Sequence, residues 1–334
     1  MISFGGAKHY AWLSAVLATI LGLAGGYLMI TLGLRYPSQT VIQYSQYILG
    51  KWLGRFVGLI YIIFFLLIAA LATRDYAELY LLLMPETPMA AFIAVSLLIA
   101  AYASVQGLAV IGRAAEILVP IIFFSIVIGI LFNTPNMDLL QLELALDDGW
   151  RPAMVDAVTQ LPFIGIAVSW LFFLPSLRTK ADARKTLLLS IAVLGLVIFL
   201  VSITIVSVLG ADAPVISNYQ FFWVFRAINI ANFIQRIESL FLISWSSTSF
   251  LMMTLFYYAA SASMKQWLGL KNRLPLILPI GAVIFLLSIV LFPSYMELRQ
   301  SFRLDRFGLI ALPIEFGIPL LLLGVDYVKA KMQR

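Results

Sequence analysis

The ionisable residue that stands out is Glu315, because it is the single charge in the apolar stretch 307–325. Pro313 and Pro319 flank it, and Gly317 lies beside it. A carboxylate at membrane depth costs about 2.5–3.5 kcal/mol on insertion scales, so it must face protein and be protonated or paired. Two interpretations stay open. Glu315 either contacts a ligand or proton, or it bonds backbone groups that the prolines leave free.

A second chemical feature is Pro162 with Gly165, which interrupt the apolar stretch 157–177. Proline removes a backbone donor, and glycine allows non-helical geometry. Irregular backbone inside a membrane is tolerated where it faces protein or a wet cavity. The pattern predicts an unwound segment whose N–H and C=O groups could hold a small polar ligand. A simple kink is the alternative.

Polar side chains occur in two further places. The run Ser244–Ser249 is rich in hydroxyls, which serve helix packing or, at Thr248, the wall of a cavity. Charged residues cluster at the end of the second apolar stretch (Arg74, Asp75 and Glu78) and at the start of the seventh (Arg236 and Glu238). They form either a solvated rim or an ion pair between the two ends. Gly22 and Gly26 form a GxxxG pair, which predicts close helix packing.

Several kinds of chemistry are excluded or disfavoured. The chain has no cysteine and one histidine, His9, so thiol catalysis is excluded and imidazole chemistry is disfavoured. It carries no phosphate-binding glycine loop and no metal-ligand cluster. We therefore expect no catalytic residue, no metal and no cofactor, and we expect a protein that is not an enzyme. The net charge of +6 does not indicate nucleic-acid binding, because basic residues in membrane proteins sort by side.

The elements that position these residues are nine long apolar stretches. A bilayer core about 30 Å thick needs roughly 20 apolar residues in a helix to cross it. The chain is 62% hydrophobic and 11% charged, whereas a soluble domain carries about 25% charge. The sequence predicts a single all-α transmembrane domain, residues 1–334. Its expected spans are 11–34, 54–83, 88–106, 114–133, 154–176, 186–210, 237–263, 274–293 and 308–328.

Charge and helix length predict the topology. With the C-terminus in the cytoplasm, 14 of the 22 basic residues fall on the cytoplasmic side. Nine spans then place Met1 outside, so either a further helix normally precedes it or the protein has nine helices. The second stretch continues to Tyr80, and the seventh is expected to begin within 228–238. If a helix precedes, these long helices occupy matched positions in two halves, which indicates an inverted repeat.

The sequence also predicts the structure of two connections between the apolar stretches. Residues 36–55 have spaced apolar side chains and a polar face, which predicts an amphipathic surface helix. Residues 221–234 are apolar and aromatic, which predicts a short helix over the outer mouth of the bundle.

Five motifs carry a family resemblance. They are YILGKWLG (47–54), PETP (85–88), INIANFIQRIESL (228–240), FPSYMEL (292–298) and LPIEFGIPL (312–320). In this order they resemble the B subunit of spore germinant receptors, the endospore germination permeases of the amino acid–polyamine–organocation superfamily. The resemblance implies a ten-helix fold of two inverted five-helix repeats, with helices one and six broken. Residues 2–14 resemble the end of the first helix, most of which is missing here.

The resemblance also implies a function. Such a subunit senses a nutrient (an amino acid, sugar or nucleoside) in the inner membrane of a bacterial spore, together with an A subunit and a lipoprotein C subunit. Carried over by position, the ligand site would comprise Leu66, Ala70, Phe163, Ile164, Gly165, Thr248, Glu315 and Phe316. Two other functions stay open. One is a proton-coupled amino acid permease with Glu315 or Glu238 as proton carrier, and the other is a non-signalling structural subunit.

Overall fold

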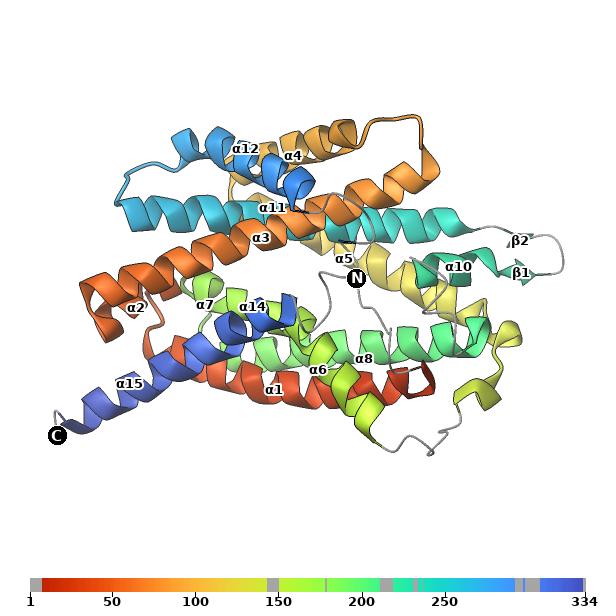
Figure 1. The fold of residues 1–334 in the computed structure, drawn as a ribbon, viewed down its shortest axis with the longest axis horizontal. Helices are drawn as coiled ribbons and strands as arrows, with labels where there is room; N and C mark the ends of the chain where they lie inside the picture. The colour runs from red at the N-terminus through yellow and green to blue at the C-terminus, as the bar shows by residue number, and fades with distance from the viewer. Residues whose placement is uncertain are drawn as a thin grey trace.

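The computed structural model describes residues 8–142, 150–177, 179–210, 219–230, 234–235, 237–291, 297 and 307–332. Within these ranges the chain is almost entirely helical, and its long helices lie side by side in one bundle (Figure 1). Eight helices in the described part of the chain are long and apolar enough to cross a bilayer. The predicted all-α polytopic membrane protein is confirmed, while the inverted repeat stays a prediction.

The eight long helices follow in chain order, two of them in pieces. They are Ala11–Arg35 (α1), Lys51–Leu83 (α3), Met89–Gln106 (α4), Leu108–Leu131 (α5), Arg151–Ser176 (α6, α7 and 3₁₀ turns), Ala183–Leu209 (α8), Glu238–Leu268 (α11) and Leu309–Met332 (α14, η8 and α15). A shorter apolar helix, α12, spans Leu274–Val290. The smaller elements are η1 (Lys8–Tyr10), α2 (Val41–Leu49), η2 (Thr134–Asn136), η3 (Leu139–Leu142), α10 (Gln220–Arg226), β1 (Asn229–Ile230) and β2 (Ile234–Gln235).

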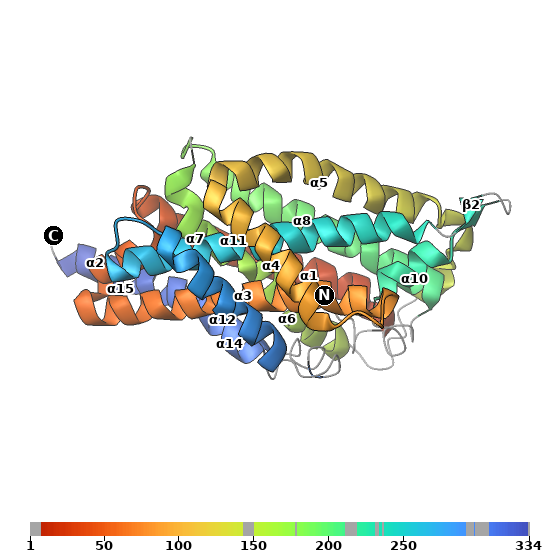
Figure 2. The same ribbon diagram turned by 90° about the horizontal axis from the view of Figure 1, so that it is seen from above.

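The centre of the bundle is the pair α3 and α11, which run alongside each other (Figures 1 and 2). With 33 and 31 residues, each is about 45–50 Å long at 1.5 Å per residue, which exceeds the bilayer core. Aromatic rings fill the space around them, and the rings of Phe65 and Phe256 lie 5.8 Å apart. The predicted extension of the second stretch past Arg74 is confirmed, because α3 ends at Leu83.

Helix α11 begins at the last residue of the range 228–238 in which the sequence places its start. Before it, the two-residue strands β1 and β2 pair antiparallel, with Asn229 opposite Gln235 and Ile230 opposite Ile234. β-branched isoleucines favour extended backbone here. The acidic side chain of Glu238 suits a first helical turn, because the helix dipole is positive there. The short helix predicted over 221–234 is likewise limited to α10, which ends at Arg226.

Helix α2 folds back tightly on the start of α3. Gly50 lies between them with a φ of +83°, a left-handed conformation that favours glycine. Gly54 contacts α2 directly, and a Cβ at that position would lie 2.5 Å from the backbone nitrogen of Gln46. The predicted helix over 36–55 is therefore right for Val41–Leu49, whereas residues 51–55 belong to α3.

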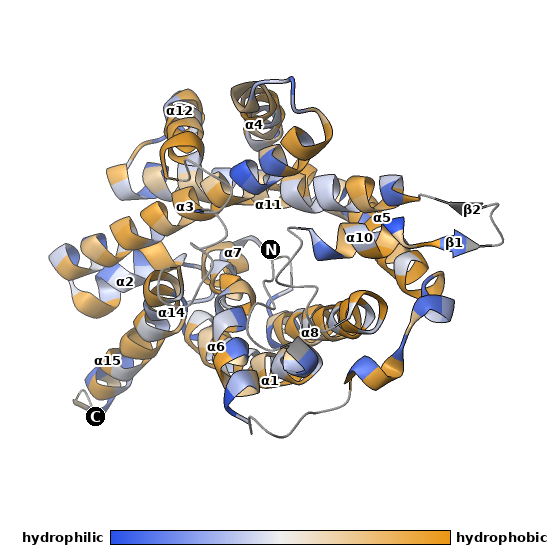
Figure 3. Cartoon of the chain, turned by 45° about the vertical axis from the view of Figure 1, so that its right-hand side comes forward, coloured by the Kyte–Doolittle hydropathy of each residue, from blue (hydrophilic) through white to orange (hydrophobic). Residues whose placement is uncertain are grey.

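The outer surface of the bundle is apolar. Large hydrophobic side chains are exposed along the helices, as at Leu98, Phe124, Leu189 and Leu278. Figure 3 shows hydrophobic residues over most of the helices and hydrophilic residues gathered at helix ends and connections. Soluble monomers rarely expose apolar surface on this scale, so the outer face fits contact with lipid.

Small residues allow helices α1, α6 and α8 to pack closely together. Gly22 and Gly26 of α1 contact Ile164 of α6 and Ile191 of α8, so the predicted GxxxG packing is confirmed. The glycine Gly195 of α8 in turn contacts Thr19 of α1. This close approach holds α6 in place beside α1.

Candidate functional site

The break expected around Pro162 has a different form. The α-helix α6 (Arg151–Gly165) continues through Pro162 and then tightens into the 3₁₀ segment η5 (Ile166–Ser169), followed by α7 (Trp170–Phe173) and η6 (Leu174–Ser176). Gly165 and Ile166 keep right-handed helical dihedrals. The expectation of an unwound segment is therefore wrong. A 3₁₀ turn still bonds backbone donors within the chain, as a membrane interior demands.

A second irregular segment lies in the last long helix. Between α14 (Leu309–Leu312) and α15 (Ile318–Met332), the π-helical segment η8 spans Pro313–Gly317. Glu315 in this segment is fully buried, and among the described residues neither of its carboxylate oxygens has a hydrogen-bond partner. π-Helical turns inside α-helices occur frequently at functional sites.

The two irregular segments meet at Gly165 and Glu315, a pair that we call the Gly165–Glu315 contact. A Cβ at Gly165 would overlap the Glu315 carboxylate, lying 2.6 Å from Cδ, and would lie 2.9 Å from Cε2 of Phe316. The Phe316 ring in turn lies against Gly25 of α1. Two glycines thus provide the room in which the carboxylate and the aromatic ring are enclosed.

Helix α3 also contacts the π-helical segment η8, through Tyr61. The buried hydroxyl of Tyr61 donates a hydrogen bond to the main-chain oxygen of Ile314, at 3.3 Å. A π-turn disturbs the usual i to i−4 ladder, so an outside donor helps to satisfy its carbonyls. Sequence reasoning missed Tyr61, because only the tertiary structure shows which of the 14 tyrosines faces this segment.

A polar pair on α6 was also missed. Gln160 donates from Nε2 to Oδ2 of Asp156 at 2.7 Å, and both side chains are buried. The Oε1 atom of Gln160 has no hydrogen-bond partner. The i, i+4 spacing of the two residues, just before Pro162, was the signal available in the sequence.

Of the eight predicted site residues, Gly165, Glu315 and Phe316 meet at the irregular segments, whereas Ile164 packs against Gly22 of α1. Leu66 and Ala70 of α3 lie in the same hydrophobic core as Phe163 and Phe316. Ala70 is also tied to α12, since its carbonyl accepts a hydrogen bond from Ser288 Oγ at 3.1 Å. Thr248 lies elsewhere, in the wall of a separate cavity.

That cavity has a volume of about 320 Å³ and lies between α3, α5, α8, α10 and α11. Most of its wall is apolar. Its polar or charged lining residues are Asp75, Tyr219, Gln220, Ser244, Trp245, Thr248 and Ser249. The hydroxyls of Ser244 and Thr248 donate to carbonyls within α11, as in the packing interpretation of the serine-rich run. We call this hollow the Asp75 cavity.

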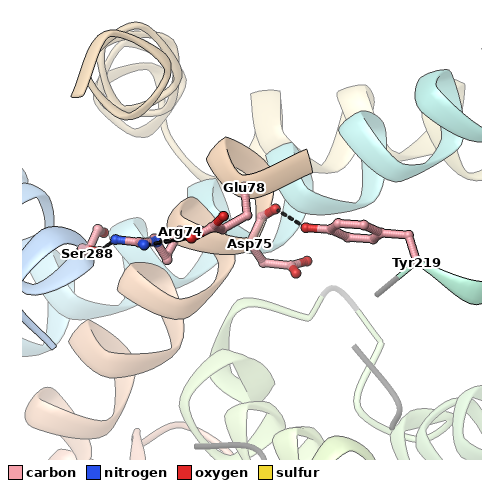
Figure 4. Close-up of polar contacts among 5 residues, drawn as sticks. All are labelled: Arg74, Asp75, Glu78, Tyr219 and Ser288. Atoms are coloured by element: carbon pink, nitrogen blue, oxygen red, sulfur yellow. Dashed lines mark hydrogen bonds and ion pairs between the residues drawn. The ribbon is translucent and has the colours of Figure 1, made fainter. Parts of the chain in front are cut away.

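The charged cluster of α3 is buried and does not form a solvated rim. Arg74 donates from Nε and Nη2 to Oε1 of Glu78, at 2.9 and 2.6 Å, and from Nη1 to the carbonyl of Ser288, at 3.2 Å. Asp75 lies apart from this pair, where its main-chain carbonyl accepts from the Tyr219 hydroxyl at 3.2 Å (Figure 4). The expected partner Arg236 lies outside the described residues.

Together these observations define a polytopic helical membrane protein with two helices that change pitch where they meet, and with a carboxyl group enclosed at that point. The sequence profile of the spore germination protein family matches residues 3–295. The chain therefore belongs to this family, and its resemblance to the germinant receptor B subunits is confirmed.

Individual relatives come from Bacillus subtilis (strain 168). Spore germination protein KB is 27% identical over 331 residues, covering 97% of this chain and 88% of the relative. Spore germination protein YndE is 27% identical over 321 residues, covering 94% and 86%. Spore germination protein A2 is 28% identical over 288 residues, covering 83% and 76%. The family profile includes the 3₁₀ segment η5 and ends before the π-helical segment η8, whereas the alignment with spore germination protein KB covers 97% of the chain.

Proposed function

We propose that this protein is the nutrient-sensing subunit of a spore germination receptor, and that it binds a small polar nutrient at the Gly165–Glu315 contact. Membership of the spore germination protein family supports a receptor or permease-like role in the membrane. The observation that carries the finer proposal is the fully buried Glu315 carboxyl, whose two oxygens have no hydrogen-bond partner. A ligand with an ammonium or hydroxyl group would supply the missing partners.

The physical basis is the cost of leaving a buried acceptor unpaired, about 1–3 kcal/mol and more for a charged group. A ligand that bonds Glu315 removes this cost. To enter, it must separate Glu315 from Gly165, because a single added carbon at Gly165 already overlaps the carboxylate. The ligand therefore binds an opened arrangement of α6 and η8 better than the closed one, and this preference shifts the equilibrium.

The rearrangement would be passed to partner subunits. We place the protein in the inner membrane of the spore with its C-terminus in the cytoplasm, alongside a receptor A subunit and a lipoprotein C subunit. The distribution of basic residues supports this orientation. The relatives named spore germination proteins KB and A2 support a receptor complex.

A proton-coupled amino acid permease is the second candidate. It is favoured by the same carboxyl group, since ionisable residues within membrane helices often carry protons. Reconstituted vesicles separate the two functions. Nutrient uptake driven by a proton gradient and lost in Glu315→Gln would support the permease, and binding without uptake would support the receptor.

The proposal is tested in spores that carry Glu315→Gln or Gly165→Leu in place of the natural subunit. Germination is followed as the fall in optical density after addition of nutrient, and the amount of subunit is measured in isolated membranes. We expect Glu315→Gln to raise the half-maximal nutrient concentration at least about tenfold, which corresponds to losing a hydrogen bond to a charged group. Gly165→Leu should abolish the response.

Gly324→Leu is the matched control, because a Cβ at Gly324 has no atom within 4 Å. It should leave the dose–response curve unchanged. Unchanged curves for both Glu315→Gln and Gly165→Leu, with normal amounts of subunit in the membrane, would contradict the proposed site.

A further inference from the structure

The Asp75 cavity is a second place where a buried acid has a carboxylate oxygen without a hydrogen-bond partner among the described residues. Asp75 is 8% exposed, lines the cavity, and its Oδ1 atom makes no hydrogen bond. The hydroxyl of Tyr219 donates to the main-chain carbonyl of Asp75 and not to its carboxylate (Figure 4). Buried acids are ordinarily paired or hydrogen-bonded, so this one indicates a ligand.

The neighbouring charges on α3 do not neutralise Asp75. The Arg74 guanidinium is bonded to Glu78 and to the Ser288 carbonyl, and Figure 4 shows this group directed away from Asp75. Arg74 and Glu78 neutralise each other, so among the described residues of α3 no positive charge is left to pair with Asp75. Within the described residues, no lysine or arginine side chain forms an ion pair with Asp75.

The remaining walls suit the body of an organic cation. Apolar side chains such as Ile126 of α5 and Val201 of α8 face the hollow. At its aromatic end the rings of Tyr219 and Trp245 lie 5.5 Å apart at 88°. Aromatic faces attract cations, and a volume of about 320 Å³ is in the range of small-molecule sites. The indole N–H of Trp245 is a second buried polar group without a partner.

We propose that the Asp75 cavity binds a small ligand with one protonated amine and an apolar body, with Asp75 as its counter-ion. The amine would bond the carboxylate, and the hydrocarbon would lie between α5, α8 and α11. This site is formed by helices other than α6 and η8, so it does not depend on nutrient binding at the Gly165–Glu315 contact.

The test uses the purified full-length chain in lipid nanodiscs made of phosphatidylglycerol, which contain no lipid amine. The probes are 2-phenylethylamine and its neutral counterpart 2-phenylethanol, and calorimetry or tryptophan fluorescence gives their dissociation constants. We expect the natural protein to bind the amine at least about tenfold more tightly than the alcohol, the value of one charge-assisted hydrogen bond. Asp75→Asn should bring this ratio close to one.

Glu116→Gln is the matched control, since Glu116 is an exposed acid on α5 that does not line the cavity. It should keep the preference for the amine. Val201→Phe fills the cavity without changing its charge, so it should weaken the binding of both probes. This variant therefore tests the cavity as the binding site even if Asp75→Asn fails to fold. Equal binding of amine and alcohol, or an Asp75→Asn protein that keeps the preference, would overturn the proposal.

The same amine chemistry could come from a free metabolite or from a lipid headgroup. Repeating the titration in nanodiscs that contain phosphatidylethanolamine separates these sources. A weaker apparent affinity for the amine probe would identify the lipid as an occupant of this site, and an unchanged affinity would identify a free amine.

Discussion

The prediction most directly tied to geometry concerns Gly165→Ala. The new Cβ would overlap the Glu315 carboxylate and lie 2.9 Å from the ring of Phe316. Glu315 is fully buried and Phe316 is half-buried against Gly25 of α1, so the carboxylate has little room to move away. Overpacking of this kind costs about 1–3 kcal/mol. Replacing a helical glycine by alanine contributes about 1 kcal/mol in the opposite direction.

Gly324→Ala is the control that separates the energetic cost of the steric overlap from the gain in helix propensity. Gly324 lies in helix α15, and a Cβ there meets no atom within 4 Å. It should therefore show the propensity gain without the overlap. We expect the Gly165→Ala protein to be less stable than the Gly324→Ala protein by about 1–3 kcal/mol. The measurement is the free energy of unfolding from sodium dodecyl sulfate titration in mixed micelles.

A double-mutant cycle identifies the partner. Glu315→Ala removes the carboxylate that the added methyl group overlaps, so Gly165→Ala should cost much less in that background, with a coupling of at least about 1 kcal/mol. Equal stability of the Gly165→Ala and Gly324→Ala proteins would refute the argument. So would a cost that persists unchanged when Glu315 is alanine.

Two further stability predictions use the same titration. Arg74→Met leaves Glu78 as a buried unpaired charge and should cost about 3–5 kcal/mol, whereas adding Glu78→Leu should recover most of the loss; no recovery would contradict the buried pair. Gly54→Ala should cost about 1–3 kcal/mol more than Gly112→Ala, because its Cβ meets the backbone of Gln46 while that of Gly112 meets nothing within 4 Å. Equal stability of these two variants would show that α2 does not pack as described.

Much of the architecture was predictable from composition. The apolar stretches that predicted membrane spans correspond to long helices, because an apolar run near bilayer length has few other stable structures in lipid. The uninterrupted stretch through Arg74 likewise predicted the length of α3. The burial of Glu315 also followed from sequence, since a carboxyl group in that position must be turned away from lipid.

The local geometry of the irregular segments was not predictable in the same way. Pro162 and Gly165 permit unwinding, a kink or a 3₁₀ turn, and these states differ little in intrinsic energy. Packing against Phe316 and α1 selects the compact form. The exact start of α11 within the expected range 228–238 was not predictable for a similar reason, because the propensities near a helix end are weak.

The amino-acid sequence by itself determined that this chain is a helical membrane protein of the spore germination protein family with an acid enclosed in its last long helix. Tertiary structure alone decided that Gly165 faces Glu315, that Arg74 pairs with Glu78, and that Thr248 lines a separate cavity with Asp75. The reason is that each of these contacts depends on how a helix is rotated about its own axis. A one-residue change in helix phase turns a side chain by about 100°, and contacts between distant helices settle that phase.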